Sequence, residues 1–400
     1  MAANDGTCRR RVPAVLARAA RDLVDNQVFM ALANGIPFAR MMFRRGGGKV
    51  FSCCGTGGGG KPLGHVITSA SDVTTRERPA MLSALRIHER ILVAFFAYLT
   101  ASAFSFPLDL QQRLVVIPLN LLVVAVLSML SREGTGDRSR FLTQVRDWIP
   151  CVLILVAYRE SGLFFIPDPT HRLDDFFIRF DDSILGYPGV LRLLAWGAPW
   201  LQRYLELSYF LCYPIVPLGL ASLYLVRNKA SKVAPGCSPA DARPLAGASH
   251  DACRRAAVER FWTAVLLASF TCYLLFPLFP LTPPRELFND VPGPQVAPVL
   301  RGMNRWLLGR YAVGASLFPS AHVAATTAMA LAIRRYLPRF GLVFVLIAAS
   351  IALATVYGRY HYAADALAGA MVGLTAYLVS KRWLGALAPV SLAQSKTQRS

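Results

Sequence analysis

The sequence predicts an all-α protein, a polytopic bundle of membrane helices, and three observations support this fold class. Of its 400 residues, 54% are hydrophobic and only 16% are charged, whereas soluble domains carry about 25% charged residues. The mean hydropathy is +0.41. The apolar residues also stand in long blocks rather than in alternation, which is typical of helices that cross a membrane.

Eight apolar blocks follow one another after residue 81. They cover residues 91–107, 114–130, 148–166, 206–226, 261–280, 317–333, 340–357 and 364–381. A spanning helix needs about 20 predominantly apolar residues, and several of these blocks are near the lower limit of length. The sequence therefore predicts six to eight transmembrane helices, with eight as the count of blocks.

The net charge is +20, and the distribution of the basic residues along the chain is typical of a membrane protein rather than of a nucleic-acid-binding protein. Arg and Lys gather in the N-terminal region and between apolar blocks, mainly in 72–90, 131–147, 227–260, 334–339 and 381–382. With eight spans, these basic segments all lie on one side of the membrane, which the positive-inside rule makes the cytoplasm. We therefore expect a multi-pass integral membrane protein with no nucleic-acid partner.

The remaining loops fall on the outer side, and they are 108–113, 167–205, 281–316 and 358–363. One of them is basic, with Arg285, Arg301, Arg305 and Arg310. An anionic ligand would explain such a cluster on that side of the membrane. In the loop 167–205, the stretch RLDDFFIRFDDSILG predicts an amphipathic segment lying at the membrane interface.

The eight cysteines predict neither a disulfide framework nor a metal site. Cys151, Cys212 and Cys272 fall inside apolar blocks, where cysteine behaves as a small hydrophobe. Cys53 and Cys54 are adjacent, and no pair of cysteines has the spacing of zinc ligands. We expect no metal and no cofactor.

Two short polar motifs interrupt the apolar blocks on the outer side. FPSAH contains Ser320, Ala321 and His322 at the start of one block, and HYAAD contains His361 and Asp365 at the start of the last. Residues four apart share a face of a helix, so Asp365 is expected to accept a hydrogen bond from one nitrogen of His361. The other nitrogen would then be free to attack an electrophile or to bind a metal.

Together these residues form a minimal set for covalent catalysis on a phosphate. His322 could donate a proton beside the nucleophile His361. Ser320 follows a proline at a helix start, where free backbone N–H groups and the helix dipole suit a phosphate. Arg285, in FPLFPLTPPRE, could bind phosphate oxygens in a bidentate manner.

Each of these residues also has a simpler interpretation. Ser320 alone is more often only a helix cap, His361 could be a solvated interfacial histidine, and Arg285 could reach the lipid headgroups. Asp365 is harder to dismiss, because a carboxylate entering an apolar block is costly without a partner or a role. All four on one membrane face favour a functional site.

FPSAH and HYAAD, with His361 placed 39 residues after His322, resemble motifs of the type 2 phosphatidic acid phosphatase and vanadium haloperoxidase superfamily. The chain is most similar to its membrane branch of inositol phosphorylceramide synthase-like and sphingomyelin synthase-like phosphotransferases. The resemblance covers residues 205–384, and DWIP around Trp148 resembles an earlier common span. The two motifs are specific together, although either alone would be weak.

The resemblance implies a role for each matching residue. His361 would be the nucleophile that forms a phosphohistidine, Asp365 would orient it, and His322 would protonate the leaving alkoxide. The groups that hold phosphate oxygens or neutralise their charge would be Ser320, Ala321 and Arg285.

The sequence departs from the superfamily pattern at three positions. Leu278 stands where a lysine is usual, Thr355 stands where an arginine is usual, and Ala321 replaces a glycine. Arg359 or Arg310 would then have to compensate for the missing cations. These departures favour a phosphodiester-like lipid substrate over a simple phosphomonoester.

The predicted domain organisation has four parts. Residues 1–80 form a basic, disordered leader, whose GTGGGGKP lacks the Gly-Lys-Ser/Thr ending of a phosphate-binding loop. Residues 81–200 hold accessory transmembrane helices and the interfacial segment. Residues 201–385 form the phosphatase or phosphotransferase core, with a polar cytoplasmic insert at 227–260, and 386–400 form a flexible tail.

The sequence thus predicts an integral membrane lipid phosphatase or phosphotransferase whose site faces the extracytoplasmic side and takes a lipid phosphate. An alternative is a transporter or flippase for a phosphorylated lipid, in which His361 and Asp365 relay protons. An inactive scaffold or a soluble haloperoxidase fits less well, because the catalytic residues are retained and the spans are many. Arg159 and Glu160, in YRESGLFF, either line the site or its lateral access route, or form a pair at the interface.

Overall fold

A computed structural model describes residues 85–131, 137–164, 172–185, 198–225, 250–287, 298–313 and 316–386. These residues all belong to Pro79–Ser400, the second of the two units into which the chain divides. The predicted leader, residues 387–400 of the predicted tail, and residues 227–249 of the predicted insert lie outside the described parts. The division between accessory helices and core at residue 200 stays a prediction.

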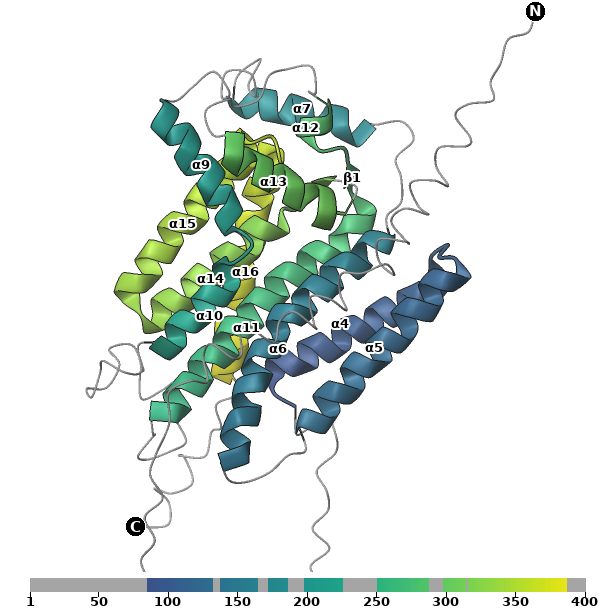
Figure 1. Ribbon diagram of the computed structural model, residues 1–400, viewed down its shortest axis with the longest axis vertical. Coiled ribbons are helices and arrows are strands. Elements are labelled where there is room, and N and C mark those ends of the chain that lie inside the picture. The colour runs from purple at the N-terminus through teal and green to yellow at the C-terminus, as the bar shows by residue number, and fades with distance from the viewer. Residues whose placement is uncertain are drawn as a thin grey trace, which may run out of the picture. The chain divides into compact units, whose positions relative to one another are not determined.

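The described residues form an all-α polytopic bundle, as the composition predicts (Figure 1). The helices of the bundle are α4 (Ile87–Ser105), α5 (Leu110–Ser131), α6 (Asp137–Ser161), α9 (Pro199–Leu211), α10 (Ile215–Leu225), α11 (His250–Leu275), α14 (Ala321–Tyr336), α15 (Pro338–Tyr357) and α16 (Ala363–Ala386). The other elements gather at one end of the bundle: η2 (Gly162–Phe164), α7 (Arg172–Leu185), η4 (Phe276–Leu278), β1 (Pro280–Leu281), α12 (Pro284–Leu287), α13 (Pro298–Tyr311) and β2 (Ser316–Leu317).

Six helices among the described residues are long and apolar enough to cross a membrane, so the chain is a multi-pass membrane protein. All eight predicted apolar blocks contain helices, but two of the blocks do not form a single helix long enough to cross the membrane. The block 206–226 is the bent pair α9 and α10, which meet at 73° and would make a seventh span. The block 317–333 is α14, whose 16 residues reach about 24 Å, less than the ~30 Å hydrocarbon layer.

The short helix α14 lies at the centre of the bundle, against α11, α15 and α16. Its buried face consists largely of small residues, among them Ala324, Ala328 and Ala332. Small side chains let neighbouring helices approach closely, and in lipid such packing replaces the hydrophobic effect as the force that joins helices. The helix that carries FPSAH is therefore held from three sides.

The closest approach to α14 comes from two glycines of α16, spaced as Gly-x-x-x-Gly. A methyl group placed on Gly369 would lie 2.5 Å from the carbonyl oxygen of Ser320, and one on Gly373 would lie 2.5 Å from that of Ala324. Only glycine permits this contact between backbones. It places the second and third turns of α16 against Ser320 and the first turn of α14.

At the far end of the bundle, charged residues tie α4, α6 and α11 together. The contacts are Arg86 with Asp147, Arg146 with Glu89 (2.5 Å) and His88 with Glu259 (2.9 Å). The indole N–H of Trp262 also donates to the carbonyl of Asp147 at 2.7 Å. Buried charges need such partners, because desolvation without them is costly. The ends of these helices are thereby fixed relative to one another.

Gly373→Ala is expected to lower the melting temperature of the purified protein in detergent. The added methyl would press on a backbone oxygen that cannot move without shifting α14, and overpacking of this kind costs about 1–3 kcal/mol.

The matched control is Gly302→Ala on α13, where a methyl would meet no atom within 4 Å. This change should leave the free energy of unfolding unchanged or raise it by up to ~1 kcal/mol, because alanine favours a helix more than glycine does. Equal melting temperatures for the two variants would contradict the close α14–α16 contact.

Candidate active site

Three segments that are distant in the sequence meet at one end of the bundle through main-chain hydrogen bonds. The N–H of Arg285 donates to the carbonyl of Arg359 at 2.9 Å, and the N–H of Ser320 donates to the carbonyl of Asp365 at 3.1 Å. Strands β1 and β2 pair antiparallel just before Arg285 and Ser320. The structure therefore brings together the three motif segments that the sequence analysis singled out.

The predicted contact between His361 and Asp365 is present, although its geometry differs from the predicted one. Nδ1 of His361 lies 3.1 Å from Oδ2 of Asp365. The helix begins only at Ala363, so His361 belongs to the preceding turn and Asp365 reaches back toward it. An ionised carboxylate only accepts hydrogen bonds, so Nδ1 would carry the hydrogen and Nε2 would be left free.

Asp365 is also fixed by the start of its own helix. It is fully buried, and its Oδ2 accepts a hydrogen bond from the N–H of Tyr362 at 3.3 Å. Tyr362 occupies the position before the first helical residue, and a carboxylate three residues on is well placed to satisfy that N–H. The carboxylate that contacts His361 is thus held by the backbone of the turn itself.

The turn from Thr355 to His361 has a fixed shape. The carbonyl of Thr355 accepts from the N–H groups of both Tyr360 (2.9 Å) and His361 (3.0 Å). Arg359 has a φ of 61°, a left-handed conformation that is uncommon outside glycine. This conformation directs the carbonyl of Arg359 to the N–H of Arg285, so the turn links two of the three segments.

His322 lies beside His361, as a shared site requires. The centroids of the two imidazole rings are 6.2 Å apart, with the rings at 74°. Tyr213 packs edge-on against His322 at 5.8 Å. Both imidazoles line the cavity described below.

Ser320 is the N-cap of α14, as its position after Pro319 predicts. Its hydroxyl accepts from the N–H of Val323 at 3.5 Å, and the side chain is fully buried. Ser320 itself does not line the cavity described next, whereas Ala321 and His322 do. The first turn of α14 therefore faces the cavity through these two residues.

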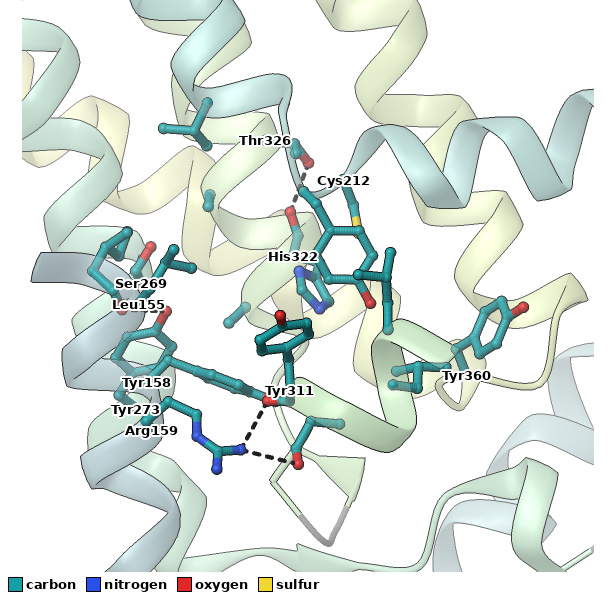
Figure 2. Close-up of a pocket in the computed structure, with 18 of the residues that line it drawn as sticks. Leu155, Tyr158, Arg159, Cys212, Ser269, Tyr273, Tyr311, His322, Thr326 and Tyr360 are labelled. Carbon is teal, nitrogen blue, oxygen red and sulfur yellow. Dashed lines mark hydrogen bonds between the residues drawn. The ribbon is translucent and has the colours of Figure 1, made fainter. Parts of the chain in front are cut away.

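A cavity of about 360 Å³ opens at the two histidines (Figure 2). Four of its lining residues have basic side chains: His322, His361, Arg159 and Arg285. Most of the others are apolar or aromatic, including Ile154, Leu155, Val216, Pro217, Phe276, Leu307 and Leu308. The cavity can therefore hold an anionic group at one part of its wall and hydrocarbon along the rest.

The neighbouring residues Arg159 and Glu160, in YRESGLFF, have different environments. Arg159 lines the cavity, and its Nη1 donates to the carbonyls of Tyr311 (3.1 Å) and Ala312 (3.5 Å) (Figure 2). Glu160 is buried and is not part of the cavity wall. Only the arginine of this pair belongs to the site.

Leu278 and Thr355, which stand where the superfamily usually has a lysine and an arginine, do not line the cavity. Arg359 and Arg310, which were expected to replace those cations, do not line it either. Leu278 is 62% exposed, and the hydroxyl of the buried Thr355 donates to the carbonyl of Ala352 within its own helix. Arg359 is buried behind the turn and Arg310 is exposed on α13. The cavity therefore receives its second guanidinium from Arg159, a residue of α6.

Arg301, one of the predicted outer arginines, binds a carboxylate of the protein. Its Nη1 donates to Glu206 at 2.6 Å, and the same carboxylate accepts from Asn304 (2.9 Å) and from the hydroxyl of Tyr360 (3.0 Å). Tyr360 in turn stacks on Tyr209 with centroids 3.7 Å apart. This network fixes the residue that directly precedes His361.

Two carboxylates of α7, which were not predicted as site residues, reach into the site region. Asp181 accepts from the N–H groups of Ala363 (2.7 Å) and Ala364 (3.0 Å), and Asp174 accepts from the N–H of Thr282 (2.8 Å). Burial raises the pKa of Asp181 to about 6, against the opposing effect of the two N–H donors. The spacing Asp174, Phe177, Asp181 marks one helix face and was the available signal.

Within the described residues, no group of three His, Cys, Asp or Glu side chains is arranged to hold a metal ion. The residues that converge are instead two histidines, a buried carboxylate and two arginines, on a bundle of membrane helices. Fold and site together define an integral membrane protein whose helices enclose a cavity lined by two histidines and two arginines.

Residues 248–379 match the sequence profile of the PAP2 superfamily. This confirms the resemblance to the type 2 phosphatidic acid phosphatases over that region, which contains Arg285, Ser320, His322, His361 and Asp365. Members of the superfamily are phosphatases and phosphotransferases, so the match supports a phosphatase-type enzyme in general. No curated protein and no solved structure matches the chain. The similarity to the inositol phosphorylceramide synthase-like branch stays a prediction.

Proposed function

We propose that this protein is an integral membrane enzyme that acts on a lipid phosphate through a phosphohistidine intermediate. The group transferred to the histidine is a phosphoryl group or, from a phosphodiester, a phosphoryl group that keeps its second ester substituent. The observation that carries the proposal is the cavity in which His361, held by Asp365, faces His322. Two guanidinium groups line the same cavity. The superfamily match supports the same chemistry.

In the first step, Nε2 of His361 attacks the phosphorus atom. Asp365 keeps the hydrogen on Nδ1 and stabilises the imidazolium that develops. The bond from phosphorus to the lipid oxygen breaks, and His322 donates a proton to that leaving oxygen. His322 must therefore hold the proton when the substrate is bound, and the negative charge of the phosphate favours this state.

The charge of the transferring group is stabilised by Arg285 and Arg159, which approach the cavity from α12 and α6. The backbone N–H groups at Ala321 and His322 add the N-terminal end of α14, where N–H groups have no acceptor within the helix. Ser320 contributes indirectly, by capping this turn. Arg359 stays a weaker candidate, because its side chain is not part of the cavity wall.

In the second step, an acceptor oxygen attacks the phosphohistidine and restores His361. Water as acceptor gives a phosphatase, and a hydroxyl of a lipid or a sugar gives a phosphotransferase. His322, now deprotonated, would take the proton of the acceptor. Leu278 and Thr355 leave the site with fewer cations than a phosphomonoesterase of the superfamily, which favours a substrate with less negative charge.

A lipid substrate is favoured by the apolar part of the wall. Leu155 of α6, Val216 of α10 and Phe276 of η4 come from different elements, and all of them line the cavity that contains the histidines. Burial of hydrocarbon contributes about 25 cal/mol per Å², so an attached chain would add to the affinity for the phosphate. A soluble phosphate ester would leave this surface unused.

The site is proposed to face the extracytoplasmic side. Helices α14 and α16 begin at the site and end with Arg334, Arg335, Lys381 and Arg382 at or near their last turns. The positive-inside rule assigns such basic ends to the cytoplasm. The ends that carry His322 and Asp365 then lie on the opposite side.

The alternative is a flippase or transporter of a phosphorylated lipid in which His361 and Asp365 relay protons. The buried carboxylate of Asp365 would suit such a relay. The alternative requires transport without product, whereas the enzyme requires a change of the lipid itself. The pair of histidines and the superfamily match favour the enzyme.

His361→Ala should abolish turnover of lipid phosphates by the purified protein, as measured by mass spectrometry of the lipids. It should also abolish the acid-labile labelling of the protein by a radiolabelled substrate. Loss of the nucleophile is expected to lower kcat on the order of 10⁴-fold or more. His322→Ala should lower it ~10²–10⁴-fold. His65→Ala, in the predicted leader, is the control. Full turnover by His361→Ala would exclude this mechanism, and lipid transport without product would favour the flippase.

Arg159→Gln should lower kcat/KM about 10- to 100-fold, because a charged hydrogen bond to the phosphate contributes ~1.5–3 kcal/mol. Arg310→Gln is the matched control, since it removes the same charge from the exposed surface of α13. Steady-state kinetics and melting temperatures should be measured for both. A lower melting temperature with unchanged kcat/KM would show that Arg159 only ties α6 to the end of α13.

In sealed membrane vesicles with the cytoplasmic face outward, an added protease should remove an epitope tag placed after residue 386. The basic end of α16 places that point on the cytoplasmic side. A tag that survives until detergent is added would reverse the proposed orientation, and with it the membrane face on which the substrate is bound.

A further inference from the structure

Helix α7 lies across the end of the bundle that holds the site (Figure 1). Asp174, Phe177 and Asp181 are spaced i, i+3 and i+7, so they share one face of α7. All three are buried, whereas Asp175 on another face is exposed. The buried face contacts each of the three segments that supply the proposed catalytic residues.

The first of these contacts completes the start of α16. The first N–H groups of a helix have no acceptor within it and need a cap. Tyr362, at the capping position, does not supply one, because its hydroxyl lies at Thr282, to whose carbonyl it donates at 3.0 Å. The N–H groups of Ala363 and Ala364 donate instead to the two carboxylate oxygens of Asp181, at 2.7 and 3.0 Å. The cap of α16 thus comes from another helix.

The second contact reaches the segment before Arg285. Oδ1 of Asp174 accepts from the N–H of Thr282 at 2.8 Å and lies 3.5 Å from the hydroxyl of Tyr362. One carboxylate therefore holds the segment that leads to Arg285 and the segment that follows His361. These are the same two segments that the hydrogen bond from Arg285 to Arg359 joins.

The third contact reaches the segment before Ser320. Phe177 packs edge-on against Phe318 with centroids 4.9 Å apart, and it lies 5.7 Å from the ring of Tyr362. Phe318 opens the motif FPSAH. One face of α7 thus touches the segments of Arg285, of Ser320 and His322, and of His361 and Asp365.

We propose that α7 is a clamp that assembles the active site, and that Asp181 is a positioning residue for the His361–Asp365 pair. The inference rests on the proposed function for its kinetic consequence. Without Asp181, two N–H groups at the start of α16 lose their acceptors, and the first turn, which carries Asp365, is free to shift relative to His361. A misplacement of about 1 Å can cost on the order of 10²-fold in rate.

The test compares Asp181→Ala and Asp181→Asn with Asp175→Ala, which removes the same charge from an exposed face of the same helix. Asp181→Ala should lower kcat about 10- to 100-fold while KM changes less than about threefold, since the cavity wall is untouched. Asp181→Asn keeps one acceptor oxygen and should recover part of the rate. Asp175→Ala should behave as the unchanged protein.

Hydrogen exchange of the full chain in detergent supplies a readout that does not depend on any substrate. Asp181→Ala should speed exchange in the peptide that contains Ala363 and Ala364, and Asp175→Ala should not. If exchange there is unchanged, or if kcat falls only in step with the unfolded fraction, the clamp is excluded. If the unchanged protein turns over no lipid phosphate, the proposed function fails, and the exchange result still decides the clamp.

Discussion

The site depends on one requirement, that the backbone N–H groups at the ends of its segments find acceptors away from water. A buried N–H without a partner costs about 1–3 kcal/mol, and this end of the bundle brings several such groups together. The N–H groups of Arg285 and Ser320 use carbonyls of the segment 359–365, and those of Ala363 and Ala364 use Asp181. The hydrogen bonds that satisfy these backbone groups thus also bring the residues of the candidate site together.

Close helix packing sets the second condition. Gly369 and Gly373 let α16 touch the backbone of α14, so the turn with Ser320 and the turn with Asp365 stand at the same level. The hydrogen bond from the N–H of Ser320 to the carbonyl of Asp365 joins the same two helices at their starts. The small residues of α14 and the paired glycines of α16 therefore keep the segments of Ser320 and Asp365 close together.

Much of the fold and the centre of the site could be predicted from the sequence, because both leave local signals. Apolar blocks mark helices, and FPSAH and HYAAD carry their chemistry in a few letters. The bend between α9 and α10 was missed, because hydropathy does not record direction. Arg159 could not be separated from Glu160, and Asp181 was read only as part of an amphipathic segment. In each case the sequence pattern indicates a helix and its polar or apolar side, but it does not show which other segment of the chain that side contacts.

The cap that α7 provides for α16 has a consequence for how this chain can be divided. The superfamily region 248–379 includes α11 to most of α16, yet the acceptor for the first N–H groups of α16 and one cavity arginine are encoded before it. Transplanting that region into a related protein would therefore separate it from residues that complete it. The structural unit that forms the candidate site is therefore longer than the region that sequence similarity recognises, and it extends back to α6.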